Sequence, residues 1–190
     1  KHYTTDKPSP DRLLDVQFYG DVRNFDNQIL DTIDVVVALA AISNDPIGNK
    51  FEEVTMEVNS HSIIKIAKEA QKRGVSSFIF ASSCSVYGFA ETGDRTEESE
   101  VNPLTAYARS KVLTETLLKE VASVDFKVTC LRFATACGIS DRLRLDLVLN
   151  DFVASAIANH EIEILSDGKP WRPLINVKDM ALAIDWAMTR

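Results

Sequence analysis

The sequence predicts an α/β fold built as a doubly wound parallel sheet with helices on both faces. Segments of strand character alternate with segments of helical periodicity along most of the chain. The strand segments, such as 35–37 and 78–80, are continuous apolar runs, which is typical of strands buried on both faces. Parallel strands need crossover connections, and helices usually supply them. The alternation therefore favours a parallel sheet covered on both sides.

The elements of the first half follow from these patterns in order. Residues 15–19 predict a strand, 27–30 part of a short helix, and 34–40 a buried strand. Residues 51–73 predict a long helix, which Gly74 closes because glycine readily adopts the left-handed backbone that ends helices. The apolar residues expected to face the core from this helix are Phe51, Val54, Val58, Ile63, Ala67 and Ala70.

The second half continues the alternation and then changes character. Pro103 precedes a broad apolar helix pattern, and proline is common in the first turn of a helix. After Gly138 the loops lengthen and carry more charge, so we divide the chain into 1–138 and 139–190, with a strand and a helix of the second part returning to the core. The predicted elements are strands at 77–81, 127–132 and 161–165, helices at 104–122 and 147–159, and a helix that begins at Ala181.

Two short segments carry side chains suited to proton transfer. The first is the serine loop, residues 82–88, which follows a buried strand, and ligands gather at the carboxyl ends of strands in open α/β sheets. The second holds Tyr107 and Lys111, which project from one face of a helix because they are four residues apart. A nearby ammonium favours the phenolate and lowers the tyrosine pKa, while the Ser83 hydroxyl can polarise an alcohol or carbonyl. This trio is a candidate site for moving a proton while a cofactor takes a hydride.

Spacing alone is a weak basis for this interpretation. Tyr3 and Lys7 have the same spacing, but Pro8 disfavours a helix there and no serine loop precedes them. A purely structural pairing of Tyr107 with Lys111 is the alternative. The order of strand, serine loop and apolar helix favours the catalytic interpretation.

Further segments complete an ordered pattern along nearly the whole chain: 20–24, 35–41, 57–59, the serine loop with the helix of Tyr107, 131–138 and 167–179. Together they resemble the extended short-chain dehydrogenase/reductases and, within them, the NAD-dependent epimerase/dehydratase group that acts on nucleotide sugars. The resemblance implies a Rossmann-like fold, NAD as the cofactor with NADP as the alternative, a nucleotide-sugar substrate and a homodimer.

The resemblance also implies a role for individual residues. The cofactor-binding positions are Asp21, Val22, Leu39, Ala40, Ala41, Asn59, Tyr107, Lys111 and Ala134. The substrate-binding positions are Ser83, Ser85, Thr135 and Arg172, and the arginine reaches a substrate phosphate. Residues 1–138 are then expected to be a partial NAD-binding domain that carries the Ser/Tyr/Lys site, and 139–190 a partial substrate-binding lobe.

One feature of the family is missing from this sequence. A dinucleotide site of this kind uses a first strand, a glycine-rich turn and a helix N-terminus directed at the pyrophosphate. The 7 glycines are scattered and residues 1–11 are polar. We interpret the sequence as an internal portion of a longer chain, and we expect residues 1–190 alone to bind NAD weakly or not at all. The alternative is a non-catalytic binding protein on the same fold that has lost its dinucleotide fingerprint.

The residues after Ser83 narrow the reaction type. Dehydratases of the family carry an acidic pair directly after the equivalent hydroxyl residue, because expelling water needs a general acid and a base. The corresponding residues here are Cys84 and Ser85, so dehydration is disfavoured. Epimerisation and one-way keto-reduction remain, and the sequence does not separate them.

The net charge of −7 and the pI near 5.0 argue against sequence-independent binding to nucleic acid, which depends on clustered Lys and Arg. An anionic nucleotide sugar still needs local cations, and the candidates are Arg142, Arg144 and Arg172. The sequence has no apolar run of the roughly 18 residues that a membrane helix needs, and no visible signal peptide, so we expect no membrane partner and a cytoplasmic location. The three cysteines form no Cys-x-x-Cys pair and the three histidines are dispersed, which predicts reduced thiols and no metal.

Overall fold

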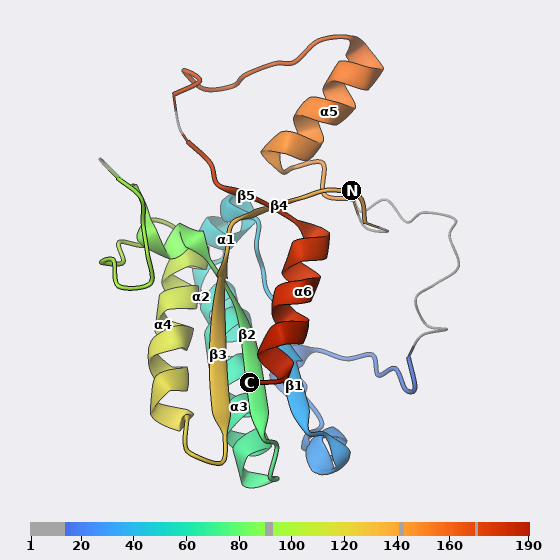
Figure 1. Cartoon of the computed structure of the whole chain (residues 1–190), viewed down its shortest axis with the longest axis vertical. Helices are drawn as coiled ribbons and strands as arrows, with labels where there is room; N and C mark the ends of the chain where they lie inside the picture. Colours follow the sequence, from blue (N-terminus) through green and yellow to red (C-terminus); the bar gives the residue numbers. More distant parts are fainter. Residues whose placement is uncertain (1–13, 90–92, 141–142, 170) are drawn as a thin grey trace. The chain divides into compact units, whose positions relative to one another are not determined.

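The computed structural model describes residues 14–89, 93–140, 143–169 and 171–190, which form two compact units (Figure 1). The larger unit consists of Gly20–Phe133 and Ala183–Arg190. The smaller unit consists of Ala134–Leu182 with residues 14–19. These two units are defined by how compactly their residues pack. The predicted functional division of the chain into 1–138 and 139–190 stays a prediction.

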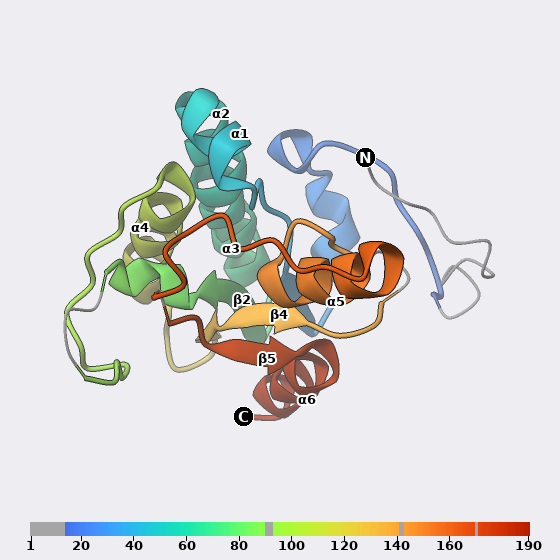
Figure 2. The ribbon, with the colours of Figure 1, turned by 90° about the horizontal axis from the view of Figure 1, so that it is seen from above.

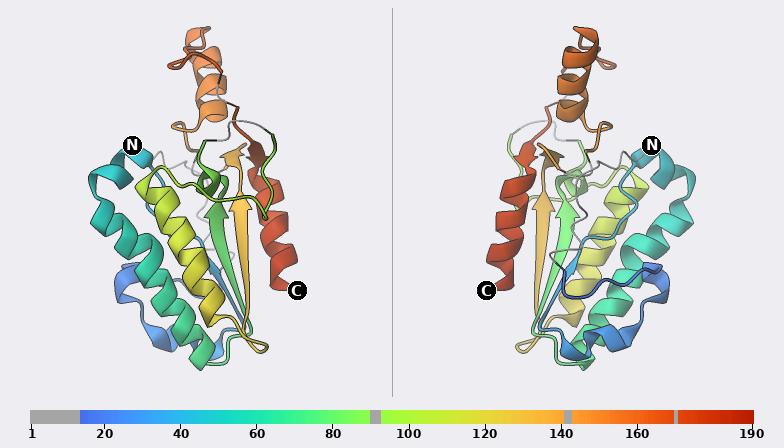
Figure 3. Two further views of the ribbon diagram at one scale, coloured as in Figure 1. Left: turned by 90° about the vertical axis from the view of Figure 1, so that its left-hand side faces the viewer. Right: turned by 90° about the vertical axis from the view of Figure 1, so that its right-hand side faces the viewer.

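The larger unit is built on a parallel sheet, as predicted. Its strands are β1 (Val35–Ala38), β2 (Ser77–Ser83) and β3 (Lys127–Phe133), in the order β1-β2-β3. The register places Phe80 beside Ala38 on one side and beside Cys130 on the other. Helices α3 and α4 cover one face of the sheet and the last part of α6, Ala183 onward, covers the other (Figure 3). The predicted doubly wound α/β architecture is therefore confirmed in this unit.

The long helix predicted at 51–73 is present, but it is divided into three parts. Helix α2 (Glu52–Met56) runs into a π-helical segment (Glu57–His61) and then into α3 (Ser62–Lys72), and a short α1 (Asp45–Lys50) precedes them. Gly74, at φ +80°, ends the helix as expected.

The predicted inward face of this helix is right for its second half and wrong for its first. Ile63, Ala67 and Ala70 are buried, whereas Phe51 and Val54 are 51% and 41% exposed. The inward positions of the first half are polar instead: Thr55 and Asn59 are fully buried. Both have hydrogen-bond partners, which offset the cost of burying a polar group, and a search for apolar periodicity passes over such residues.

Helix α4 (Ala106–Val121) carries the predicted Tyr/Lys pair and begins after Thr105, whose hydroxyl accepts a hydrogen bond from Ala108 N at 3.2 Å. The core lies between this helix, α3 and the sheet, with Phe78 and Phe126 in contact at a ring-centroid separation of 6.1 Å. Its buried apolar side chains come from α3, α4 and the strands and pack the helices against the sheet.

The smaller unit contains two short strands that the sequence did not predict. Strands β4 (Thr135–Cys137) and β5 (Leu174–Asn176) lie side by side and pair in parallel (Figure 2). Helix α5 (Val148–Asn159) matches its prediction, and α6 (Val177–Met188) begins earlier than the predicted start at Ala181.

The strands predicted at 15–19 and 161–165 are wrong, because neither segment is a strand in the structure. Their apolar side chains are exposed, Phe18 by 65% and Leu165 by 89%. Apolar character favours a strand only where a neighbouring strand takes its backbone hydrogen bonds. In the described part of the chain, no helix has both the length and the apolar character required to cross a bilayer.

Candidate active site

The serine loop, residues 82–88, starts in the last two residues of β2. The strand runs to Ser83, two residues beyond its predicted end, and a 3-10 turn (Cys84–Tyr87) follows. Ser83 caps this turn, since its Oγ accepts a hydrogen bond from Ser85 N at 3.2 Å. Gly88 closes the turn at φ +63° and donates its N–H to Ser85 O at 3.1 Å. The hydroxyls of the loop are thereby held at the carboxyl end of a central strand.

Helix α4 brings Tyr107 and Lys111 together beside this strand. Lys111 is 2% exposed, and its Nζ donates to Ala81 O at 2.7 Å. The same Nζ lies 4.5 Å from the centre of the Phe80 ring and 5.4 Å from that of Tyr107. The predicted four-residue spacing thus places the Lys111 ammonium beside the Tyr107 ring.

The surroundings of Lys111 change its acidity. Burial lowers the pKa of its ammonium to about 8, while the negative charge of Glu115 acts in the opposite direction. Lys111 therefore remains mostly a cation at neutral pH. The Cys130 thiol is also close, and burial raises its pKa to about 12, so it stays uncharged over the same range.

Asn59 joins the segment after β1 to helix α4. Its Oδ1 accepts from Ile42 N at 2.7 Å and its Nδ2 donates to Ile42 O at 3.0 Å and to Ser110 Oγ at 3.1 Å. Asn59 O accepts from the Thr114 hydroxyl at 3.1 Å. These bonds hold the backbone of Ile42, directly after the predicted cofactor contacts at 39–41, of which Leu39 is 59% exposed.

Asp21, one of the predicted cofactor-binding residues, is a partly exposed carboxylate. Hydrogen bonds from Arg23 hold its pKa at about 2, and its Oδ2 accepts from Arg23 Nη2 at 2.5 Å. Val22 begins the following 3-10 turn, Val22–Asn24. Asp21 is therefore ionised at neutral pH and its oxygens are hydrogen-bond acceptors only.

Ser85 is one of three serines, with Ser60 and Ser77, whose buried hydroxyl has no hydrogen-bond partner among the described residues. An orphaned buried hydroxyl costs stability, and at a binding site it is a natural point for a ligand atom to attach. The substrate-binding role of Ser85 stays a prediction.

The predicted residues Ala134, Thr135 and Arg172 belong to the smaller unit. Thr135 N donates to Pro173 O at 3.0 Å, which ties the segment of Arg172 to the start of β4. An open hollow of about 490 Å³ is lined by Gly168, Lys169, Trp171 and Arg172.

Trp171, next to Arg172, does not pack this segment, because its side chain is 97% exposed. The backbone bond from Thr135 to Pro173 holds the segment instead of burial of the indole. Of the other candidate cations, Arg144 pairs with Asp146 at 2.7 Å, and Arg142 lies outside the described residues.

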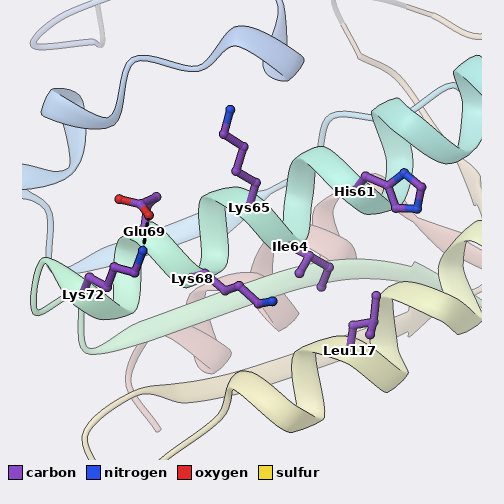
Figure 4. A pocket seen from close by; sticks show the side chains of 7 residues that line it. All are labelled: His61, Ile64, Lys65, Lys68, Glu69, Lys72 and Leu117. Carbon is purple, nitrogen blue, oxygen red and sulfur yellow. Dashed lines mark hydrogen bonds and ion pairs between the residues drawn. The ribbon is translucent and has the colours of Figure 1, made fainter.

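A second open pocket, of about 320 Å³, lies along the outer side of α3 and contains none of the predicted site residues (Figure 4). Ile64 of α3 and Leu117 of α4 line it where the helices meet, and Lys72 pairs with Glu69 at 2.6 Å. Its remaining lining residues are His61, Lys65 and Lys68. Their charged groups give it the character of a solvated helix surface.

Sequence reasoning missed a group of polar residues behind the serine loop. Glu115 and Arg132 form an ion pair, with Nη2 of the arginine 2.7 Å from Oε2 of the glutamate. Two signals were available: Glu115 follows Lys111 by one helical turn, and Arg132 is a charged residue inside an otherwise apolar strand.

The geometry can be compared with known proteins. The sequence model of the NAD dependent epimerase/dehydratase family matches residues 4–190. A UDP-glucose epimerase of Bacillus subtilis (strain 168), itself uncharacterised, is 26% identical over 159 residues, 82% of this chain and 49% of that protein. A dTDP-glucose 4,6-dehydratase of Streptomyces griseus is 28% identical over 158 residues, 83% of this chain and 48% of that protein. The chain thus spans about half the length of these curated relatives.

Solved structures give the same fold. MoeE5 in complex with UDP-glucose and NAD matches with a TM-score of 0.81 and 26% identity, over 90% of this chain and 57% of that chain. A UDP-N-acetylglucosamine 4-epimerase from Methanobrevibacter ruminantium M1, in complex with UDP-N-acetylmuramic acid, also matches at 0.81 and 26%, over 90% of this chain and 56% of that chain.

Proposed function

Because the chain belongs to the NAD-dependent epimerase/dehydratase family, we propose that it carries the proton-transfer site of an enzyme that epimerises or keto-reduces a nucleotide-activated sugar. The observation that carries the proposal is the buried Lys111 ammonium beside the Tyr107 ring. A buried charge is costly unless it is paired with an opposite charge or has a function. Here the Lys111 ammonium lies where it would stabilise a phenolate at Tyr107. The non-catalytic alternative is not favoured by the family membership.

In this proposal each of three side chains has one task. Tyr107 takes the proton of a sugar hydroxyl as phenolate and returns it as phenol. Lys111 lowers the pKa of that phenol through its positive charge. Ser83, at the end of β2, donates its hydroxyl hydrogen to the sugar oxygen and orients it.

The residues near Lys111 fit the nicotinamide ribose of NAD, with NADP as the alternative. In the part of the chain that the structure describes, Ala81 O is the one hydrogen-bond acceptor of Nζ, which leaves two of its three protons for ribose hydroxyls. The small residues Ala40 and Ala41 would let such a ring approach the backbone. The nicotinamide, when bound, accepts and returns a hydride. Asp21 would accept a hydrogen bond from the adenine.

The reaction proposed is epimerisation or keto-reduction rather than dehydration. Cys84 and Ser85 stand where the family's dehydratases carry their acidic pair, and a thiol and an alcohol cannot replace a carboxylic acid and a carboxylate in expelling water at neutral pH. Assays of the full protein with NAD and a panel of UDP-, dTDP-, GDP- and CDP-sugars test this. A 4-keto-6-deoxy product would contradict it, and a product isomeric with its substrate would identify an epimerase. Assembly as a homodimer is part of the proposal, and light scattering of the full protein tests it.

We expect Arg172→Ala to raise the substrate KM by about ten- to a hundredfold, because a charge-assisted hydrogen bond contributes about 1.5–3 kcal/mol. The affinity for NAD is expected to change little. Lys169→Ala is the matched control: it removes a neighbouring cation that already pairs with Asp167 at 3.7 Å, and it should leave KM within threefold. Equal losses of substrate and NAD affinity in the Arg172 variant would argue against a phosphate contact.

Turnover should fall as the pH rises through about 8, since that is where Lys111 loses the charge that favours the Tyr107 phenolate. A kcat profile from pH 6 to pH 10 measures this. Lys119→Ala is the control, because it removes an exposed lysine of the same helix that does not contribute to the shifted pKa of Lys111, and the alkaline limb should stay in place. A profile that remains level to pH 10 would contradict the role given to Lys111.

A further inference from the structure

Arg132, next to the serine loop, connects four separate segments of the larger unit. Arg132, on β3, contacts Glu115 with both arms of its guanidinium: Nε lies 3.0 Å from Oε1 and Nη2 lies 2.7 Å from Oε2. Its Nη1 donates to Tyr87 Oη at 3.0 Å and to Glu97 O at 3.4 Å. The guanidinium also stacks on the Tyr87 ring, 5.1 Å from its centre. One side chain thus joins β3, α4, the end of the serine loop and the segment after it.

Glu115 extends these contacts to the start of the serine loop. Its Oε1 accepts a short hydrogen bond from the hydroxyl of Ser82, which is 3% exposed. One turn earlier on α4, Lys111 binds the carbonyl of Ala81. Consecutive turns of the helix therefore hold consecutive residues of β2, which fixes the helix both along and around its axis.

The ion pair is poorly explained by stability alone. Its side chains are 21% and 12% exposed, and a mostly buried pair loses much of its attraction to the cost of desolvation. Apolar side chains of similar volume are often as stabilising in such a place. What they cannot supply is a planar fork of donors with fixed directions. The hydrogen bonds that Arg132 donates to Glu115 raise the pKa of the guanidinium further above its usual range, so the group stays charged.

We propose that Arg132 and Glu115 are positioning residues that hold the serine loop at a fixed distance from Tyr107 and Lys111. Ser82 and Tyr87, which they bind, lie at the two sides of Ser83 and Ser85. Fixing both ends of this short turn fixes the hydroxyls between them relative to α4. This inference rests on the proposed function for its catalytic consequence, although the restraint on the loop can be measured without it.

The test measures the loop and the reaction separately in the full protein. Arg132→Lys keeps the charge but loses the fork, Glu115→Gln keeps the shape but loses the charge, and Tyr87→Phe removes one hydroxyl. Arg73→Lys is the matched control, because Arg73 also pairs with a carboxylate distant in sequence, Asp31, and touches none of these residues.

Hydrogen exchange followed by mass spectrometry should show the amides of 84–88 exchanging at least about tenfold faster in the three test variants, and unchanged in the control. At a temperature where each variant is fully folded, kcat should fall by roughly 10- to 100-fold with KM within threefold, because a displacement of about 1 Å can cost that much. Tyr87→Phe should lower kcat by about tenfold, the smaller effect of this range. This variant also tests the inference if the Arg132 and Glu115 variants do not fold.

Unchanged exchange at 84–88 in the folded variants would overturn the inference. So would faster exchange with parental kcat in a protein that Tyr107→Phe inactivates, because the loop would then not need to be fixed. If Tyr107→Phe is itself fully active, the proposed function fails, and the exchange data still decide whether the pair restrains the loop.

Discussion

Tyr107→Phe should lower turnover by roughly 10²-fold or more while leaving the melting temperature almost unchanged. The substitution removes only the hydroxyl, which in the proposed site is the atom that takes and returns the proton. The ring keeps its place against Lys111, whose Nζ lies 5.4 Å from the ring centre, so packing is preserved. Steady-state kinetics and a thermal melt of the full protein measure the two effects.

Tyr19→Phe is the control for this change, since it removes the same hydroxyl from a side chain that is 86% exposed. It should leave turnover within twofold. Lys111→Met should resemble Tyr107→Phe in turnover and should also weaken NAD binding, because the ammonium is proposed to hold the nicotinamide ribose. Near-normal turnover in Tyr107→Phe would remove the basis of the catalytic assignment.

Gly88→Ala should destabilise the protein by about 3 kcal/mol, or roughly 6–12 °C in melting temperature. Two costs add at this position. The backbone has φ +63°, where a side chain is strained, and an alanine Cβ would lie 1.9 Å from Asn102 O. That oxygen belongs to the backbone, which cannot move aside as a flexible side chain can. The neighbouring Asn102 N also donates to Val86 O at 2.9 Å, so the serine loop would have to shift.

Gly74→Ala separates the two costs. Gly74 has a similar φ of +80°, but nothing lies within 4 Å of the position where its Cβ would be. Its replacement should cost only the backbone strain, about 1 kcal/mol. Equal melting temperatures for the two variants would show that the close approach of the serine loop to Asn102 does not constrain the fold.

Local sequence patterns were sufficient to predict much of this fold and the Tyr107/Lys111 pair of the candidate site. The helix predicted at 104–122 is α4, Ala106–Val121, and the strand predicted at 77–81 is the core of β2, Ser77–Ser83. Tyr107 and Lys111 lie together because residues four apart share a helix face wherever the helix forms. Helical periodicity is a property of neighbouring residues, so it can be recognised in the sequence.

What the sequence left open depends on residues that are distant along the chain. Strands at 15–19 and 161–165 were predicted and are absent. The three-residue strands β4 and β5 exist because they pair with each other, although the paired residues, such as Thr135 and Leu174, are 39 positions apart in the sequence. A strand needs a partner strand for its backbone hydrogen bonds, and the residues within the strand do not identify that partner.

The sequence by itself determined the family, the parallel α/β architecture and the Tyr107/Lys111 pair, because motifs and periodicity are local. Only the tertiary structure decided that Lys111 is buried against Ala81 O, that Asn59 clamps Ile42, and that Arg132 joins Glu115 to Tyr87. Burial and hydrogen-bond partners arise when separate elements pack together, and they set both the acidity of a side chain and the direction in which it is held.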